Sequence, residues 1–129
     1  GYGVCLDLTR RDLQNEAKQL SRPWDWSKGF DASAVCSDLV PVSVTGHPST
    51  SAIWLKINGE MRQQGTLEEM IWPVADVIAA ISRAMELKAG DLIYTGTPAG
   101  VGALQPGDKV TAGVAGVTEI ASEIGAKPE

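Results

Sequence analysis

The dipeptide Asn58-Gly59 predicts a β-hairpin near the middle of this chain. The residues before it, 52–58, alternate between apolar and more polar side chains, which is typical of a half-buried strand. Asn-Gly suits the tight two-residue turn that joins antiparallel strands, because both positions must adopt positive φ angles. Residues 60–63 are the expected return strand.

The segments on either side of the hairpin add more strands than helices. Strands are expected at residues 2–6, 39–44, 92–95, 109–114 and 117–124, helices at residues 9–20 and from Pro73 to Met85, and an irregular packed loop at residues 24–38. Pro23 ends the first helix, and Pro73 suits the start of the second. We therefore expect one α+β domain that is dominated by β structure and carries short helices.

The charge and hydropathy patterns exclude two classes of partner. The formal net charge is −5 and no cluster of Lys and Arg exceeds two adjacent residues, which argues against nucleic acid. No apolar run approaches the roughly 20 residues of a membrane-spanning helix. Cys5 and Cys36 lack the spacing of a metal-thiolate motif, so we expect two buried free thiols, as suits a reducing cytoplasm.

A glycine-rich segment follows the predicted strand at 92–95. Residues 94–102 contain three glycines, two threonines and a proline. Glycine lets backbone N–H groups approach a ligand closely, because it has no Cβ to block the way. An abrupt change from apolar to charged residues also occurs at Asp7, where the first strand ends. Together the two strand ends indicate a site for a small anion.

Several residues near these strand ends are candidates for chemistry, each with a structural alternative. Asp7 is a candidate ligand for a hard cation, or it caps the following helix. Arg11 and Gln14 lie on one helix face and could bind a substrate carboxylate, or they belong to a solvated surface. Lys28 could be a focused cation or a base, or its stem packs over the nearby aromatic rings.

Gly96 and Thr97 are the candidates in the glycine-rich segment, and an ordinary strand-to-loop turn is their alternative reading. His47 is the single histidine of the sequence. It lies in a turn rich in Gly, Pro and Ser with no apparent orienting partner nearby, so we expect no role for it as a general base.

These segments, taken in order, resemble the C-terminal catalytic domain of the fumarylacetoacetate hydrolase family, especially its acylpyruvate and fumarylpyruvate hydrolase branch. The resemblance covers roughly residues 1–115. It rests on Cys5-Leu6-Asp7-Leu8-Thr9-Arg10-Arg11-Asp12-Leu13-Gln14, Pro23-Trp24, Ser27-Lys28-Gly29-Phe30, Leu55-Lys56-Ile57-Asn58-Gly59-Glu60-Met61-Arg62-Gln63, Thr66 to Met70-Ile71, Gly90-Asp91-Leu92-Ile93-Tyr94-Thr95-Gly96-Thr97-Pro98 and Gly100-Val101-Gly102.

The resemblance implies a mixed β-roll or sandwich, usually a homodimer, that binds Mg²⁺ or Mn²⁺ through three carboxylates. Asp7 matches one of these carboxylates, and Lys28 matches the active-site lysine. Arg11, Gln14 and Thr97 match positions that hold the pyruvate end of the substrate, and Gly96 lies in the same loop. The family's Glu-x-Glu motif and lid His-Glu pair lie upstream of such an aspartate, and neither is found in this sequence.

The resemblance further implies hydrolysis of a C–C bond in an acylpyruvate such as fumarylpyruvate, through an enolate of pyruvate that the metal stabilises. Decarboxylation of oxaloacetate and tautomerisation of 2-oxo acids pass through a similar enolate and remain alternatives. Because the sequence starts at Gly1 on a strand-like pattern, we expect a partial domain, residues 1–129, of a longer polypeptide. An inactive fragment is the third possibility.

Overall fold

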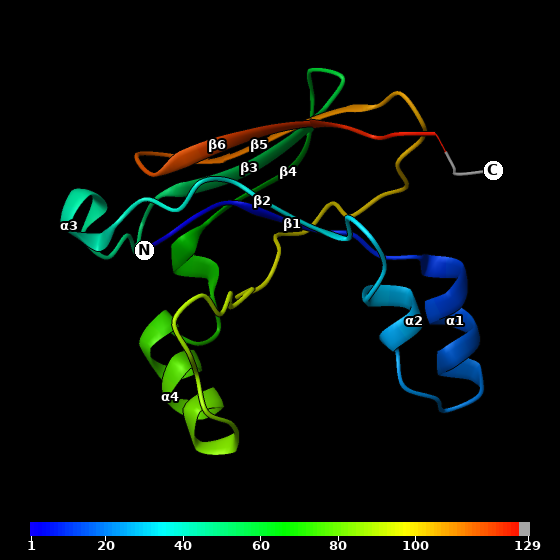
Figure 1. Ribbon diagram of the computed structural model, residues 1–129. Coiled ribbons are helices and arrows are strands. Elements are labelled where there is room, and N and C mark those ends of the chain that lie inside the picture. The colour runs from blue at the N-terminus through cyan, green and yellow to red at the C-terminus, as the bar shows by residue number, and fades with distance from the viewer. Residues whose placement is uncertain (127–129) are drawn as a thin grey trace.

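The computed structural model describes residues 1–126, and its centre is a four-stranded antiparallel sheet. The strands β3 (Ala52–Ile57), β4 (Glu60–Thr66), β5 (Lys109–Val114) and β6 (Thr118–Glu123) lie in the order β4-β3-β5-β6. The predicted hairpin and the two C-terminal strands are therefore confirmed, as is the α+β class dominated by strands (Figure 1).

The hairpin turn has the backbone that its sequence predicts. Asn58 and Gly59 adopt φ angles of 52° and 86°, as the mirror-image turn requires. The Asn58 amide also donates to a carboxylate oxygen of Asp108 at 2.8 Å and accepts from the Lys109 N–H at 2.9 Å. These bonds tie the turn to the start of β5. The backbone N–H of Gln105 and the Asn58 amide lower the pKa of Asp108.

A second sheet of two short antiparallel strands lies beneath the first (Figure 1). β1 (Cys5–Asp7) overlaps the end of the strand predicted at residues 2–6 and extends one residue beyond it. Its partner β2 (Ala34–Cys36) lies in the segment expected to be an irregular loop. That expectation was wrong for these three residues, because a strand this short carries no alternation of its own and is defined by its pairing with β1. It was also wrong for residues 25–28, which form a short helix.

The buried core lies between the two sheets. Val4 and Leu6 at β1 pack with three alternate residues of β5, Val110, Ala112 and Val114, and all five side chains are buried. Period-two spacing sends these β5 side chains to one face of the sheet. The core therefore fixes the position of β1, and with it the position of Asp7 at the strand's end.

The helices are short, and two of them lie together. They are α1 (Arg11–Gln19), α2 (Asp25–Lys28), α3 (Val42–Thr45), the 3₁₀ helix η1 (Leu67–Glu69) and α4 (Val74–Ala84). α1 and α2 pack against each other near the end of β1, whereas α4 lies well away from them (Figure 1). Across residues 1–126, every helix falls short of the length and apolar character needed to cross a bilayer.

Two predicted strands are absent from the described part of the chain. Residues 42–45 form α3, because Pro41 starts a helix and its carbonyl accepts the N–H of Val44 and of Thr45. Residues 92–95 run without a strand ladder. The loop that follows them is held by a side chain instead, since the Gln63 amide donates to the carbonyl of Pro98.

Candidate active site

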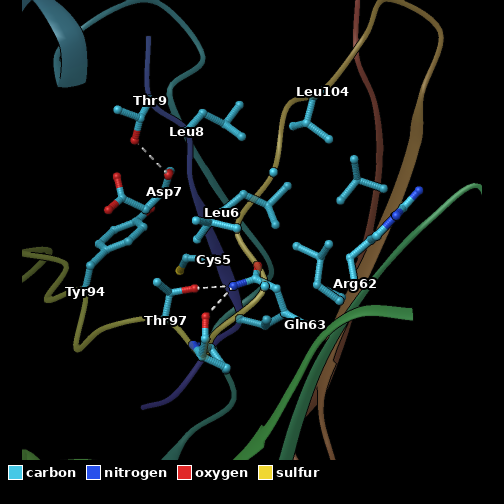
Figure 2. Close-up of a pocket in the computed structure, with 18 of the residues that line it drawn as sticks. Cys5, Leu6, Asp7, Leu8, Thr9, Arg62, Gln63, Tyr94, Thr97 and Leu104 are labelled. Atoms are coloured by element: carbon cyan, nitrogen blue, oxygen red, sulfur yellow. Dashed lines mark hydrogen bonds between the residues drawn. The ribbon is translucent and has the colours of Figure 1, made fainter. Parts of the chain in front are cut away.

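A cavity of about 800 Å³ lies between the end of β1, the start of α1, the hairpin strands and the glycine-rich loop (Figure 2). Five of the six residues predicted from the sequence to form a site line it: Asp7, Arg11, Lys28, Gly96 and Thr97. Gln14 lies outside the lining but bonds directly to Arg11. The fold therefore brings together residues that are up to 90 positions apart in sequence, from Asp7 to Thr97.

Lys28 and Asp7 form an ion pair at the mouth of this cavity. The Lys28 ammonium donates to a carboxylate oxygen of Asp7 at 2.5 Å and to the Thr9 hydroxyl at 3.0 Å. The side chains of Lys28 and Asp7 are 36% and 55% exposed, so both charges remain open to a ligand. The aspartate is thus held by a cation and does not cap α1, whose N-cap is Arg10 without a side-chain bond.

Buried contacts behind Lys28 hold it in place. Ser27 is 1% exposed, its hydroxyl donates to the Trp24 carbonyl at 2.6 Å, and its own carbonyl accepts the Arg10 N–H at 3.0 Å. The Arg10 guanidinium also stacks over the ring of Phe30, 4.5 Å from its centroid. These bonds join α2 to the β1–α1 connection, so the lysine is fixed opposite the aspartate.

Arg11 and Gln14 act as a pair on the first turns of α1. The Arg11 guanidinium donates to the Gln14 side-chain oxygen at 2.8 Å. Gln14 is only 5% exposed, whereas Arg11 is exposed and reaches the cavity. The buried amide therefore orients the guanidinium, which keeps further N–H donors for an anionic group.

The glycine-rich loop runs closely along β4. Gly100 has a φ of 102°, and a Cβ placed on it would come within 2.1 Å of the Arg62 carbonyl oxygen. Only glycine fits there. Gly96 has a φ of 126°, which also disfavours a side chain. These glycines let the loop pass between β4 and the cavity and present Thr97 to the cavity.

Gln63 holds this loop, a role that sequence reasoning missed. Its amide donates to the Thr97 hydroxyl at 2.8 Å and to the Pro98 carbonyl at 2.7 Å (Figure 2). The sequence placed Gln63 only at the end of a return strand. Its position four residues after the turn dipeptide gave no indication of a partner 34 residues away.

Replacing Gln63 by alanine is expected to lower the free energy of unfolding by about 1–2 kcal/mol, because two hydrogen bonds are lost. The loss should appear in urea denaturation. Gln64→Ala is the matched control, since Gln64 is the exposed next residue of the same strand, and should change stability by no more than about 0.5 kcal/mol. Equal losses in the two variants would show that the loop contacts contribute nothing.

Half-buried Cys5 and exposed Tyr94 form a neutral polar pair beside Asp7. Burial and a hydrogen bond with Cys36 raise the pKa of Cys5 to about 11. Burial, the bond to Cys5 and the nearby negative charges raise the pKa of Tyr94 to about 12. At neutral pH both groups therefore keep their protons, and the Tyr94 hydroxyl donates its hydrogen bond to the Cys5 sulfur.

The described residues supply only part of a metal site. Asp7 and Asp12 are the acidic side chains that line the cavity. Within residues 1–126, no group of three His, Cys, Asp or Glu side chains lies close enough to hold a metal ion. A hard divalent cation takes six or more oxygen ligands, some of them water. A carboxylate such as Asp7 could supply one such ligand, but the described residues do not form a full set of protein ligands.

His47 lies apart from the residues that line the cavity. Its Nδ1 is 2.7 Å from the Tyr2 hydroxyl, and the residue is exposed. We expect His47→Ala to change kcat by no more than about twofold, as for other exposed substitutions. Steady-state kinetics would check this, and a large loss of kcat would mean that the histidine takes part in the reaction.

Comparison with known proteins identifies relatives across nearly the whole chain. The sequence model described as fumarylacetoacetate (FAA) hydrolase C-terminal matches residues 1–125. An oxaloacetate tautomerase of Escherichia coli is 48% identical over 112 residues, which are 86% of this chain and 51% of that protein. The chain thus spans about half the length of the curated relatives it matches.

Solved structures show the same fold. A candidate fumarylpyruvate hydrolase of Burkholderia cenocepacia superposes with a TM-score of 0.97 at 66% identity, covering 99% of this chain and 57% of that one. A fumarylpyruvate hydrolase of Pseudomonas aeruginosa, solved with Mn²⁺ and pyruvate, gives a TM-score of 0.95 at 42% identity. That match covers 98% of this chain and 55% of the other.

Proposed function

The chain belongs to the fumarylacetoacetate hydrolase C-terminal family, and we propose that it forms part of a divalent-metal-dependent enzyme acting on 2-oxo acids. The observation that carries the proposal is the meeting of Asp7, Lys28, Arg11 and Thr97 around one cavity. These side chains supply a cation ligand, two cations and a hydroxyl. Such a set suits a ligand that carries a carboxylate next to a carbonyl group.

We infer that the substrate is an acylpyruvate such as fumarylpyruvate, which water cleaves to pyruvate and a carboxylic acid. The Pseudomonas aeruginosa hydrolase with Mn²⁺ and pyruvate supports this choice, because its fold matches over 98% of the chain. Mg²⁺ or Mn²⁺ would be held by Asp7, with its other protein ligands coming from outside residues 1–126. When bound, such a metal withdraws electron density from the 2-oxo group.

The chain's own residues would bind and orient the pyruvate end. The Arg11 guanidinium, held by Gln14, would pair with the substrate carboxylate. The Thr97 hydroxyl and the N–H of Gly96 would donate to oxygen atoms of the same end. C–C cleavage leaves negative charge on the pyruvate oxygen as an enolate, and the Lys28 ammonium would stabilise that charge.

Keto–enol tautomerisation of oxaloacetate is the second candidate function. The Escherichia coli oxaloacetate tautomerase, 48% identical, specifically favours it. Tautomerisation needs the same charge stabilisation at the 2-oxo group, because it passes through an enolate without breaking a C–C bond. Decarboxylation of oxaloacetate would use that stabilisation as well. The residues of this cavity serve all three reactions, so the choice depends on what contacts the distal half of the substrate.

A substrate panel on the complete protein tests the proposal. Fumarylpyruvate is expected to give equimolar fumarate and pyruvate in the presence of Mn²⁺, and a chelator should stop the reaction. Rapid interconversion of the oxaloacetate tautomers without release of fumarate and pyruvate would favour the second function. If neither substrate reacts, and no CO₂ is released from oxaloacetate, the chain belongs to a member of the family without these activities.

We propose that residues 1–129 are a partial catalytic domain of a cytoplasmic homodimer in the catabolism of aromatic compounds. The relatives' greater length and the incomplete ligand set around Asp7 support the first part of this proposal. Light scattering on the complete protein tests the dimer, and a monomer would contradict it.

A further inference from the structure

The two cysteines of the chain lie directly opposite each other on neighbouring strands. Cys5 of β1 and Cys36 of β2 are register partners, although 31 positions separate them in sequence. Their sulfur atoms are 3.0 Å apart, and both thiols are free and half-buried. This contact could not be predicted from the sequence, because the spacing of the two cysteines matches no known thiol motif.

The position of the pair in the ladder suits a covalent bond. The Ser37 N–H donates to the carbonyl of Val4, the residue beside Cys5. Because hydrogen-bonded and non-hydrogen-bonded pairs alternate along antiparallel strands, Cys5 and Cys36 form a non-hydrogen-bonded pair. The Cα atoms of such pairs are about 4.5 Å apart, which lies within the range of about 4.4–6.8 Å found for disulfides. No separation of the strands is needed.

A small oxidant can also reach the pair. Cys5 lines the cavity of about 800 Å³ together with Tyr94 and Asp7 (Figure 2). The sulfurs need to approach from 3.0 Å to the bonded distance of about 2.05 Å. Small rotations of the two side chains supply a movement of this size.

We propose that Cys5 and Cys36 form a reversible oxidation site that closes to an intramolecular disulfide on reaction with a small peroxide. In the first step one sulfur attacks hydrogen peroxide through the small fraction of thiolate that the raised pKa of Cys5 leaves at neutral pH, so that an S–O bond forms, the O–O bond breaks and one water leaves. The second sulfur then displaces that oxygen, which departs with the remaining thiol proton as a second water. Each sulfur is oxidised by one electron, and the two peroxide oxygens are reduced.

Two equivalents of a small thiol reverse the reaction by thiol–disulfide exchange. The bond would join β1 to β2 two residues before Asp7, on the strand that ends at the active-site cavity. Disulfides that form in a reducing compartment are usually transient, and this pair has the geometry for such a cycle. The site stands independently of the proposed enzyme function.

The test uses the reduced complete protein, treated with hydrogen peroxide at fixed pH and mapped as peptides without reduction. The peptides that contain Cys5 and Cys36 are expected to be joined, with the loss of two hydrogens. The midpoint temperature of thermal unfolding should rise by roughly 5–15 °C. Dithiothreitol should restore both free thiols and return the midpoint to that of the reduced protein.

Cys36→Ser is the control variant, because it leaves Cys5 without its partner. Its oxidation should stop at a sulfenic acid, which dimedone traps, with no rise in the midpoint. The proposal is overturned if wild-type Cys5 and Cys36 stay free or are oxidised separately. It is also overturned if Cys36→Ser shows the same rise in midpoint as the wild type.

Discussion

Asp7→Asn is expected to lower metal-dependent turnover by at least about 100-fold. Even the loss of a residue that only hydrogen-bonds to a metal ligand lowers activity or metal affinity by up to about 100-fold. Asparagine keeps the size of the side chain and can still accept a hydrogen bond from Lys28. It removes the negative charge that a hard divalent cation needs. Turnover is measured over a range of Mn²⁺ concentrations up to saturation. The concentration dependence reports metal binding, and the rate at saturation reports the chemical step.

Asp76→Asn is the matched control for this substitution. Asp76 is exposed on the first turn of α4, outside the residues that line the cavity. Its activity and Mn²⁺ dependence should equal those of the wild type. If Asp7→Asn retains normal turnover and normal Mn²⁺ dependence, Asp7 is not a metal ligand and the ligand set lies entirely elsewhere.

Lys28→Ala should lower kcat by about 10²–10³-fold, as the loss of one positioned donor to a developing negative charge typically does. KM should change less, because the substrate carboxylate is assigned to Arg11. The variant also loses the bonds from the ammonium to Asp7 and Thr9. Thermal melting must therefore accompany the kinetics, so that a loss of folded protein is not mistaken for a loss of catalysis.

Lys88→Ala is a close control, because Lys88 also forms an ion pair, with Glu86 at 3.7 Å. Both of its partners are largely exposed, at 71% and 81% for the side chains. Exposed pairs of this kind contribute at most about 1 kcal/mol, so its kcat should be unchanged. If Lys28→Ala lowers kcat no more than Lys88→Ala does, Lys28 has a structural role only.

Local sequence signals predicted the sheet well where they were strong. Asn58-Gly59 located the hairpin, and the alternation of residues 52–58 located β3, because each of these signals reports a conformation of the local chain. β2 and α3 were missed, because the local sequence pattern did not indicate either conformation. Three residues pair with β1 to form β2, and Pro41 starts α3 in a segment that otherwise suits a strand.

Some residues of the candidate site could be predicted from the sequence and others could not. Asp7, Arg11, Lys28 and Thr97 could be named from the sequence, because charged and glycine-rich segments follow predicted strands and match a family's motifs. Gln63 and the Cys5–Cys36 contact could not, since their partners lie 34 and 31 positions away and depend on which strands pair. Long-range register was the information that the sequence lacked.

Calorimetry with oxalate, a stable mimic of the pyruvate enolate, tests the central claim most directly. Oxalate would be titrated into the complete protein with and without Mn²⁺, and into Asp7→Asn and Lys28→Ala. We predict oxalate binding only with Mn²⁺, its loss in Asp7→Asn and weaker binding in Lys28→Ala. If the affinity for oxalate is the same without Mn²⁺ and in both variants, there is no metal-dependent enolate site at this cavity.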